Sequence, residues 1–347
     1  MDTISDKVLS VGDSPTIMNA LDHFQDTLTT MIIDINDAIQ QAPDLESDQQ
    51  TNSVAKPNLK TPTEQLFSVY NVQLGESKEQ VEQEVGAPKR QSTNEFGTKW
   101  FTYHEDYQNF VMISYNEENR VNGLFTNQDL LSSSIGITLE SSKETVHAEL
   151  GDPLTTIRKG LIRYQLESEG EYDLFKLEDS YVTVFYDKHA NSTVTAIQII
   201  HEDLEANRSD FYSDPSTALN EGFEYQLFDL TNAARVNHGL NVLTWDELVK
   251  ETARKHSLDM AENLFFDHEN LEGQSPFDRM EQDGIHYTVA GENLAYGQFS
   301  SIFAHEGLMN SLGHRENILN DSYAFLGVGV AFNEDSQPYF TENFFNR

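Results

Sequence analysis

The sequence predicts an α+β protein with an N-terminal amphipathic helix, a middle domain that uses one helix-plus-antiparallel-meander unit twice, and a C-terminal domain of helices packed on a small sheet. Three observations support this. An apolar stripe at steps of three and four precedes residue 40, and a short motif recurs 65 residues later, from Ser77 to Ser142. The last third has helical patterns first and strand patterns last. At 347 residues, the chain can bury two separate cores.

The charge and the cysteine content exclude several classes of function. There are 58 acidic and 22 basic side chains, a formal charge of −36, so phosphate backbones are repelled and nucleic acid is not an expected partner. Cysteine is absent, which excludes disulfides and thiolate metal sites. No run approaches the roughly 20 apolar residues of a membrane span, so none is expected in this sequence.

Residues 1–63 form the first predicted segment. Leu21, Phe24, Leu28 and Met31 begin a stripe that continues to residue 38 and predicts one amphipathic helix. We expect this helix to dock on its own domain rather than to pair with a second copy, because the stripe is shorter than three heptads. Residues 40–63 are polar and predict a linker.

Residues 64–205 form the predicted duplicated domain. Ser77 and Ser142 are each placed to cap a short helix, which Gly86 and Gly151 then end. The β-prone runs that follow are 99–103, 110–115 and 121–125 in the first copy, and 161–164, 181–186 and 194–199 in the second. Each copy is therefore expected to be a helix followed by a three-stranded meander.

Residues 217–347 form the predicted C-terminal domain. A first helix ends at Gly239, and Thr244 with Glu247 has the form of a capping box that opens the second. His256 lies on the apolar side of this second helix, where we expect a packed, hydrogen-bonded core histidine. Further helices are predicted from Ser275 and over 301–310, and strands over 326–332 and 339–345.

Three motifs in this domain nominate a functional cleft. They contain His268, Glu292 and His314. Two imidazoles and a carboxylate in one place can hold a divalent metal or a polar ligand. His268 and His314 are the candidate zinc ligands, with Glu292 or a water completing the shell.

Together the motifs resemble a known family. The matching segments are 232–235 (Asn-Ala-Ala-Arg), 243–246 (Leu-Thr-Trp-Asp), 266–268 (Phe-Asp-His), 291–293 (Gly-Glu-Asn) and 310–315 (Asn-Ser-Leu-Gly-His-Arg). Residues 223–347 resemble a bacterial CAP domain, of the superfamily of cysteine-rich secretory proteins, antigen 5 and plant pathogenesis-related protein 1. The duplicated region resembles the CAP-associated N-terminal domain of Gram-positive bacteria.

The resemblance implies an αβα sandwich with a cleft lined by a His/Glu/Glu/His tetrad. Residue by residue, His268 and His314 are the histidines and Glu292 is the first glutamate. Ser311 stands at the position of the second glutamate, which makes the tetrad incomplete here. Glu306 lies nearby in the sequence without matching the pattern.

Other residues are candidates for the cleft only because they lie near these motifs in the sequence. Asn293, Tyr296 and Tyr287 are expected at the rim of the cleft, and His305 with Glu306 are secondary candidates. The resemblance also implies an extracellular or cell-envelope location in a Gram-positive bacterium, with the export segment outside this sequence.

Four interpretations of function remain open. The first is a non-enzymatic protein that binds a small molecule or lipid in the cleft, with or without zinc. The second is a metal-dependent hydrolase of a peptide, ester or cell-wall substrate, with Glu292 as general base. In the third, the repeats bind a protein partner through a strand edge or an aromatic patch. In the fourth, His268, Glu292 and His314 form a purely structural hydrogen-bond network.

Overall fold

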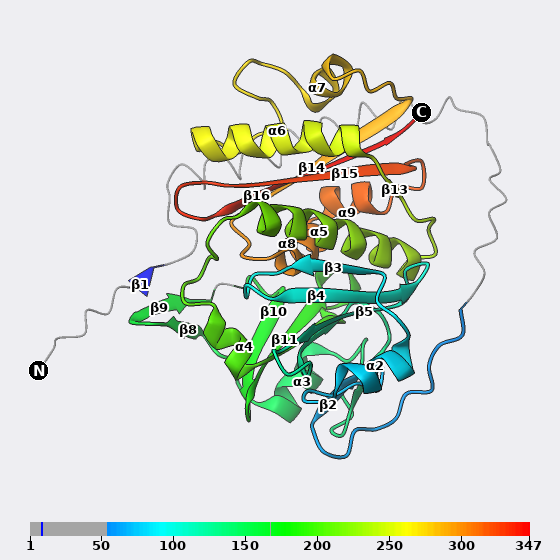
Figure 1. The fold of residues 1–347 in the computed structure, drawn as a ribbon, viewed down its shortest axis with the longest axis vertical. Coiled ribbons are helices and arrows are strands. Elements are labelled where there is room, and N and C mark those ends of the chain that lie inside the picture. Colours follow the sequence, from blue (N-terminus) through cyan, green and yellow to red (C-terminus); the bar gives the residue numbers. More distant parts are fainter. Residues whose placement is uncertain (1–7, 10–53, 167) are drawn as a thin grey trace, which may run out of the picture.

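The two larger sheets of the structure are stacked with three layers of helices (Figure 1). The computed structural model describes residues 8–9, 54–166 and 168–347. The predicted amphipathic helix and most of the linker lie outside these residues. The described end of the linker, residues 54–63, contains neither helix nor strand. It lies along the middle domain, where the Val54 N–H donates to the Gln108 side chain at 2.9 Å.

The middle domain is built on a seven-stranded antiparallel sheet. Its strands, in their order across the sheet, are β10 (Tyr172–Leu177), β11 (Ser180–Asp187), β12 (Thr193–His201), β6 (Val121–Thr126), β5 (Gln108–Tyr115), β4 (Lys99–Glu105) and β3 (Arg90–Thr93). The pairing of β12 with β6 joins the two meanders at the centre, with Ile199 opposite Leu124. Successive residues of each strand point to opposite faces of this continuous sheet, so the sheet contributes side chains to a core on each face.

Both meanders are preceded by a capped helix, as predicted. These helices are α2 (Lys78–Val85) and α3 (Lys143–Leu150). The Ser77 hydroxyl accepts from the N–H of Gln80, and that of Ser142 accepts from Thr145. Both helices lie on the face of the sheet away from the C-terminal domain (Figure 1). Their packing residues Val81 and Val146 are fully buried.

One strand assignment was wrong. The run 161–164 does not begin the second meander, which starts instead with β10. It falls in β9 (Ile162–Gln165), which pairs with β8 (Thr156–Lys159) and with β1 (Val8–Leu9) in a separate small sheet. The run 161–164 and the segment that forms β10 are both β-prone, and the local sequence does not reveal which of them will pair with β11. The smaller elements of the domain are β2 (Phe67–Val69), β7 (Leu131–Ser133), the 3₁₀-helix η1 (Lys188–Ala190) and α4 (Glu202–Asn207).

The C-terminal domain is an αβα sandwich, as the resemblance implied (Figure 1). Its sheet has the order β13 (Thr244–Trp245), β15 (Phe325–Phe332), β16 (Pro338–Asn346) and β14 (Val289–Tyr296). The helices are α5 (Thr217–Asn237), α6 (Glu247–Asn263), α7 (Pro276–Gln282), α8 (Ser301–Asn310) and α9 (Leu312–Ile318). Helices α6 and α7 cover one face, and α5, α8 and α9 cover the other. The predicted strands are confirmed, and β13, β14 and α9 are additional elements.

The cap of α6 differs from the prediction. Asp246, not Thr244, accepts hydrogen bonds from the N–H groups of Leu248 and Val249. Thr244 is instead in β13, paired parallel with β15. A carboxylate satisfies the exposed N–H groups as well as a hydroxyl does, so the helix begins near the predicted position by another route.

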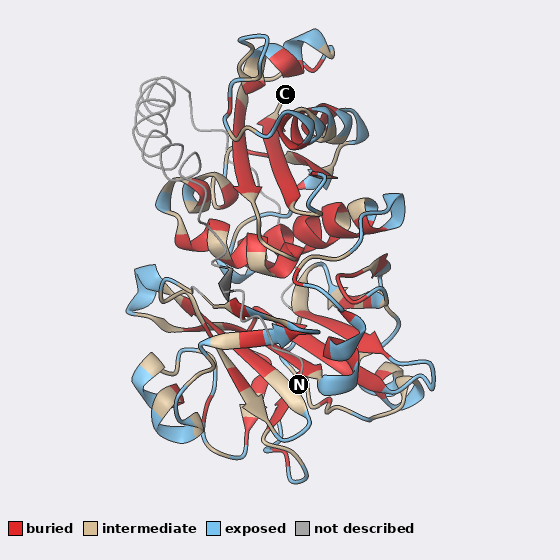
Figure 2. Cartoon of the chain, turned by 90° about the vertical axis from the view of Figure 1, so that its left-hand side faces the viewer, coloured by how far each residue is buried: buried red, intermediate tan, exposed pale blue. Residues whose placement is uncertain are grey.

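Helix α5 lies between the two sheets and belongs to both cores. Phe223 packs with the C-terminal sheet, whereas Leu230 packs with Trp100 of the middle domain. The whole helical layer between the sheets is largely buried (Figure 2). Asp229 of α5 is also buried and pairs with Arg90 at 3.0 Å. Helix α5 of the C-terminal domain is thus joined to the middle domain by an apolar contact and an ion pair.

Candidate functional site

His268 and Glu292 are in direct contact in the C-terminal domain. Helix α6 ends at Leu264, whose φ of 55° turns the chain into the loop that carries His268. Glu292 comes from β14, an edge strand of the sheet. Nδ1 of His268 lies 2.8 Å from Oε1 of Glu292, and both residues are 5% exposed. The structure therefore brings these two predicted residues together in a buried polar pair.

Arg279 is the residue that sequence reasoning missed. It lies on α7 and pairs with Oε2 of Glu292 at 2.7 Å, with only 7% of its side chain exposed. The same guanidinium donates to the backbone carbonyl of His268 at 2.6 Å. Arg279 thus holds both the carboxylate and the loop that carries the histidine. The only signal for it would have been that a buried carboxylate needs a cation.

Glu292 is held as a carboxylate by these neighbours. Burial alone would raise its pKa, but the charge of Arg279 and the hydrogen bond from His268 outweigh burial and lower the pKa below its usual value. Both carboxylate oxygens are engaged, one by each partner. An engaged carboxylate with a lowered pKa is a weak proton acceptor, which weakens the case for Glu292 as a general base.

His314 is oriented by the residue that replaces the second glutamate. Nδ1 of His314 lies 2.7 Å from the hydroxyl of Ser311, which is the residue just before α9. Burial, together with the nearby His268, lowers the pKa of His314 to about 3. The imidazole is therefore neutral at physiological pH, the form that binds metals and accepts hydrogen bonds.

Asn293 is not at a rim. It is fully buried, and as the neighbour of Glu292 on a strand it points to the opposite face of the sheet. Its amide nitrogen donates to the carbonyl of His314 and to Glu342, both at 3.1 Å. The amide oxygen accepts from Asn317 at 3.0 Å. Asn293 therefore fastens α9, and with it His314, to the sheet.

The two tyrosines contact other parts of the domain. Tyr287 packs against Phe277 with ring centroids 6.1 Å apart. The Tyr296 hydroxyl donates to Gln337 at 2.6 Å, and its ring packs against Phe266 at 5.9 Å. Phe266 lies two residues before His268, so Tyr296 is adjacent to the histidine loop. A role for either tyrosine in binding stays a prediction.

The secondary candidates belong to another region. His305 and Glu306 lie on α8, buried beside Asp187 of the middle domain and Arg315. Burial lowers the pKa of His305 to about 3 and, aided by the Asp187 charge, raises that of Glu306 to about 8. His256 is a core histidine as predicted, 1% exposed, with Nε2 2.9 Å from the carbonyl of Asp267.

The donor set bears on zinc in two ways. Each of the two histidines has its Nδ1 engaged, by Glu292 and by Ser311, and such partners commonly orient metal-binding imidazoles. Within residues 54–166 and 168–347, however, no three His, Asp or Glu side chains are arranged to hold one metal ion. Zinc at His268 and His314 would need water or ligand atoms for its other positions.

Comparisons with known proteins agree with the architecture. Residues 74–211 match the family described as CAP-associated N-terminal, and residues 228–344 match the cysteine-rich secretory protein family. One match spans both meanders, so a sequence duplication within the middle domain stays a prediction. Among the described residues, none of the helices has the length and apolar character needed to cross a bilayer.

Two relatives come from Bacillus subtilis. The uncharacterized membrane protein YlbC is 29% identical over 303 residues, which is 82% of this chain and 85% of that protein. The uncharacterized protein YkwD is 39% identical over 135 residues, 39% of this chain and 51% of that protein. The longer match includes both domains, whereas the shorter one is the length of a single domain.

Two solved structures share the fold. An extracellular protein with an SCP domain from Bacillus anthracis has a TM-score of 0.68 at 23% identity, covering 87% of this chain and all of that one. A cysteine-rich secretory protein from Staphylococcus aureus has a TM-score of 0.61 at 16% identity, and the match covers 79% of this chain and 94% of that protein. The αβα sandwich, the seven-stranded domain before it and the two family matches lead to one conclusion: the chain contains a CAP-associated N-terminal domain at residues 74–211 and a CAP domain of the cysteine-rich secretory protein family at residues 228–344.

Proposed function

We propose that this protein acts outside the cytoplasm as a non-enzymatic binding protein, and that its CAP domain takes a small ligand or a divalent metal at His268 and His314. The extracellular setting is supported by the description of the Bacillus anthracis neighbour and by the name of the secretory protein family. One observation carries the choice of binding over catalysis. Arg279 and His268 occupy both oxygens of Glu292.

That observation counts against the hydrolase. A general base must be free to take a proton from water, and its pKa should lie near the working pH. Glu292 has a lowered pKa and two fixed partners, and taking up a proton would weaken its ion pair with Arg279. The same arrangement suits a histidine that binds through Nε2, because the carboxylate at Nδ1 fixes the ring orientation and increases its basicity.

The experiment is a zinc titration of the full chain by calorimetry. We expect micromolar binding by the parent protein that is lost in the His268→Ala/His314→Ala double variant. His286→Ala is the matched control, because His286 is an exposed histidine of the same domain. Retained binding in the double variant, or no binding by the folded parent, would refute the zinc site.

A second titration tests the role assigned to Ser311. Because its hydroxyl holds Nδ1 of His314, Ser311→Ala should weaken zinc binding by about tenfold, within the range known for residues that orient metal ligands. Ser322→Ala, at a serine elsewhere in the same domain, should leave the affinity unchanged. An effect of equal size in both variants would show that Ser311 does not position the imidazole.

A further inference from the structure

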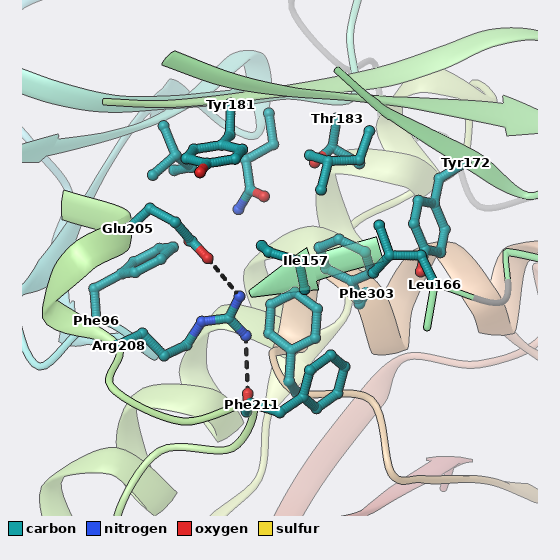
Figure 3. Close-up of a pocket in the computed structure, with 14 residues that line it drawn as sticks. Phe96, Ile157, Leu166, Tyr172, Tyr181, Thr183, Glu205, Arg208, Phe211 and Phe303 are labelled. Atoms are coloured by element: carbon teal, nitrogen blue, oxygen red, sulfur yellow. Dashed lines mark hydrogen bonds and ion pairs between the residues drawn. The ribbon is translucent and has the colours of Figure 1, made fainter. Parts of the chain in front are cut away.

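A second recess lies between the two domains, away from the histidines (Figure 3). Its floor is the face of the seven-stranded sheet formed by β11 and β12. The β8–β9 hairpin covers it on one side, with Ile157 pointing inward, and Phe303 of α8 closes the other. The recess has about 460 Å³ of empty space including its open mouth, but only about 30 Å³ in which the centre of a water molecule fits. That is room for about two water molecules.

The lining combines an apolar body with a few buried polar groups. Aromatic and aliphatic side chains supply most of it, from both domains. Arg208, at the end of α4, projects its guanidinium into the recess (Figure 3). It packs over the ring of Phe299 at 4.1 Å and donates to Glu205 at 2.9 Å. This pattern of apolar walls with few fixed polar groups is typical of small-molecule sites.

Two hydrogen-bond donors in the wall have no partner among the residues that the structure describes. They are Nε2 of Gln198, a residue 97% buried in the sheet floor, and Nε of Arg208. A buried donor without an acceptor costs about 1–3 kcal/mol, so such groups in a recess indicate a ligand or water that accepts from them. Because one donor belongs to a guanidinium, a carboxylate would bind it more strongly than a neutral oxygen.

Several carboxyl groups share the buried cations beside the recess. Glu205 is shared between Arg208 and Lys159, whose ammonium lies 2.5 Å from it. Glu95 also interacts with Arg208, but burial raises the pKa of Glu95 to about 7 and so reduces its negative charge at pH 6. Asp210 also faces Lys159 and Tyr164, so Glu205, Asp210 and Glu95 share the two buried cations. Within the described residues, Nε of Arg208 is the donor of this cluster that is left for a ligand.

The cover of the recess can move without breaking the main sheet. The β8–β9 hairpin belongs to a separate small sheet and shares no strand pairing with β10, β11 or β12. Side-chain bonds hold it down, including Lys159 to Glu205 and Tyr164 to Asp210. Leu161 at the tip of this hairpin is an apolar side chain that is 78% exposed.

We propose that this recess binds an aliphatic carboxylate, with its head group on Gln198 and Arg208 and its chain among the aromatic side chains beneath a displaced β8–β9 hairpin. The space in which atoms fit is too small for such a chain until the hairpin lifts. Binding therefore couples ligand entry to a movement of the hairpin against the C-terminal domain. The site is separate from His268 and His314, so its test does not depend on theirs.

The test uses decanoate as the probe, with the full chain at pH 6. Calorimetry should show one decanoate bound per chain, and Gln198→Leu should weaken binding by about tenfold while the protein stays folded, because it removes an unpartnered donor and keeps the side-chain bulk. Gln91→Leu, the same change at an exposed position of the same sheet, is the control. The His268→Ala/His314→Ala variant should bind decanoate like the parent.

Two further readouts decide between a built site and simple apolar adsorption. Decanol and decyltrimethylammonium have a similar chain with another head group, and both should bind at least tenfold more weakly than decanoate. Because the chain has no cysteine, Leu161→Cys can carry a single fluorophore, whose emission should change on addition of decanoate. Equal binding of the three probes, or equal affinity of the two glutamine variants, would overturn the proposal.

Discussion

Replacing Gly222 by alanine should lower the free energy of unfolding by about 3 kcal/mol, the size of a severe overpacking effect. Gly222 is within α5, where helix propensity alone would favour alanine by about 1 kcal/mol. A methyl group there would, however, overlap the backbone carbonyl of Thr93 in β3. Backbone cannot move aside as a flexible side chain can, so α5 must shift away from the middle domain.

Gly307 provides the matched control. It is also a glycine in the interior of a helix, α8, but the nearest atoms to an added methyl group are side-chain tips at 3.9 and 4.0 Å. Gly307→Ala should therefore raise the free energy of unfolding by about 0.5–1 kcal/mol. Urea unfolding of both variants gives the two values. If Gly222→Ala raises the free energy of unfolding as Gly307→Ala does, helix propensity, rather than the contact between α5 and β3, controls the effect at Gly222.

Replacing Arg279 by alanine should destabilise the protein by about 3–5 kcal/mol at pH 7, because it leaves a buried carboxylate without its cation. Glu292 has 1% of its side chain exposed, so water cannot take over the role of the guanidinium. Lys255→Ala is the control. That lysine pairs with Asp283 at a similar 2.7 Å but has 65% of its side chain exposed, and its loss should cost at most about 1 kcal/mol.

The effect should depend on pH with a defined sign. In the parent, the lowered pKa of Glu292 gives stability that is present above the unfolded pKa and lost as pH falls through the folded one. Without Arg279, burial dominates and raises that pKa, so the variant loses stability as pH rises through the raised value. The difference between parent and variant should thus be largest near pH 7 and shrink towards about pH 4.

A second substitution tests the cause directly. Glu292→Gln in the Arg279→Ala background removes the buried charge and should recover a large part of the lost stability. No recovery, together with a pH-independent loss, would assign the effect to packing of the arginine side chain instead. Both variants also measure how much the hydrogen bonds of Glu292 contribute to stability. They therefore test the interpretation that His268, Glu292 and His314 form a purely structural network.

The sequence predicted the site better where a motif was local than where a contact was long-range. His268, Glu292 and His314 each lie in a short recognisable run, so they could be named. Arg279 could not, because it reaches Glu292 from another element and no periodic pattern distinguishes a buried arginine from an exposed one on α7. The burial of Asn293 became clear only when β14 was found to be a strand, since its neighbour then had to face the other way.

In the fold, too, features set by local sequence were predicted and features set by long-range contacts were not. Caps at Ser77 and Ser142 depend on three or four consecutive residues and were predicted. The partner of the run 161–164 depends on which β-prone segment reaches the sheet, which is a tertiary choice. The recess beneath that hairpin could not be predicted for the same reason, because its lining comes from strands, a helix end and a loop of two domains.

Helix α5 has a consequence for how such a protein can change over generations. Gly222 contacts the sheet of the middle domain and Phe223 contacts the sheet of the C-terminal domain, so both domains pack against the same helix. A substitution on α5 must therefore suit both domains at once. Moving the C-terminal domain alone into a new chain would bring α5 without the middle-domain surface that Gly222 contacts.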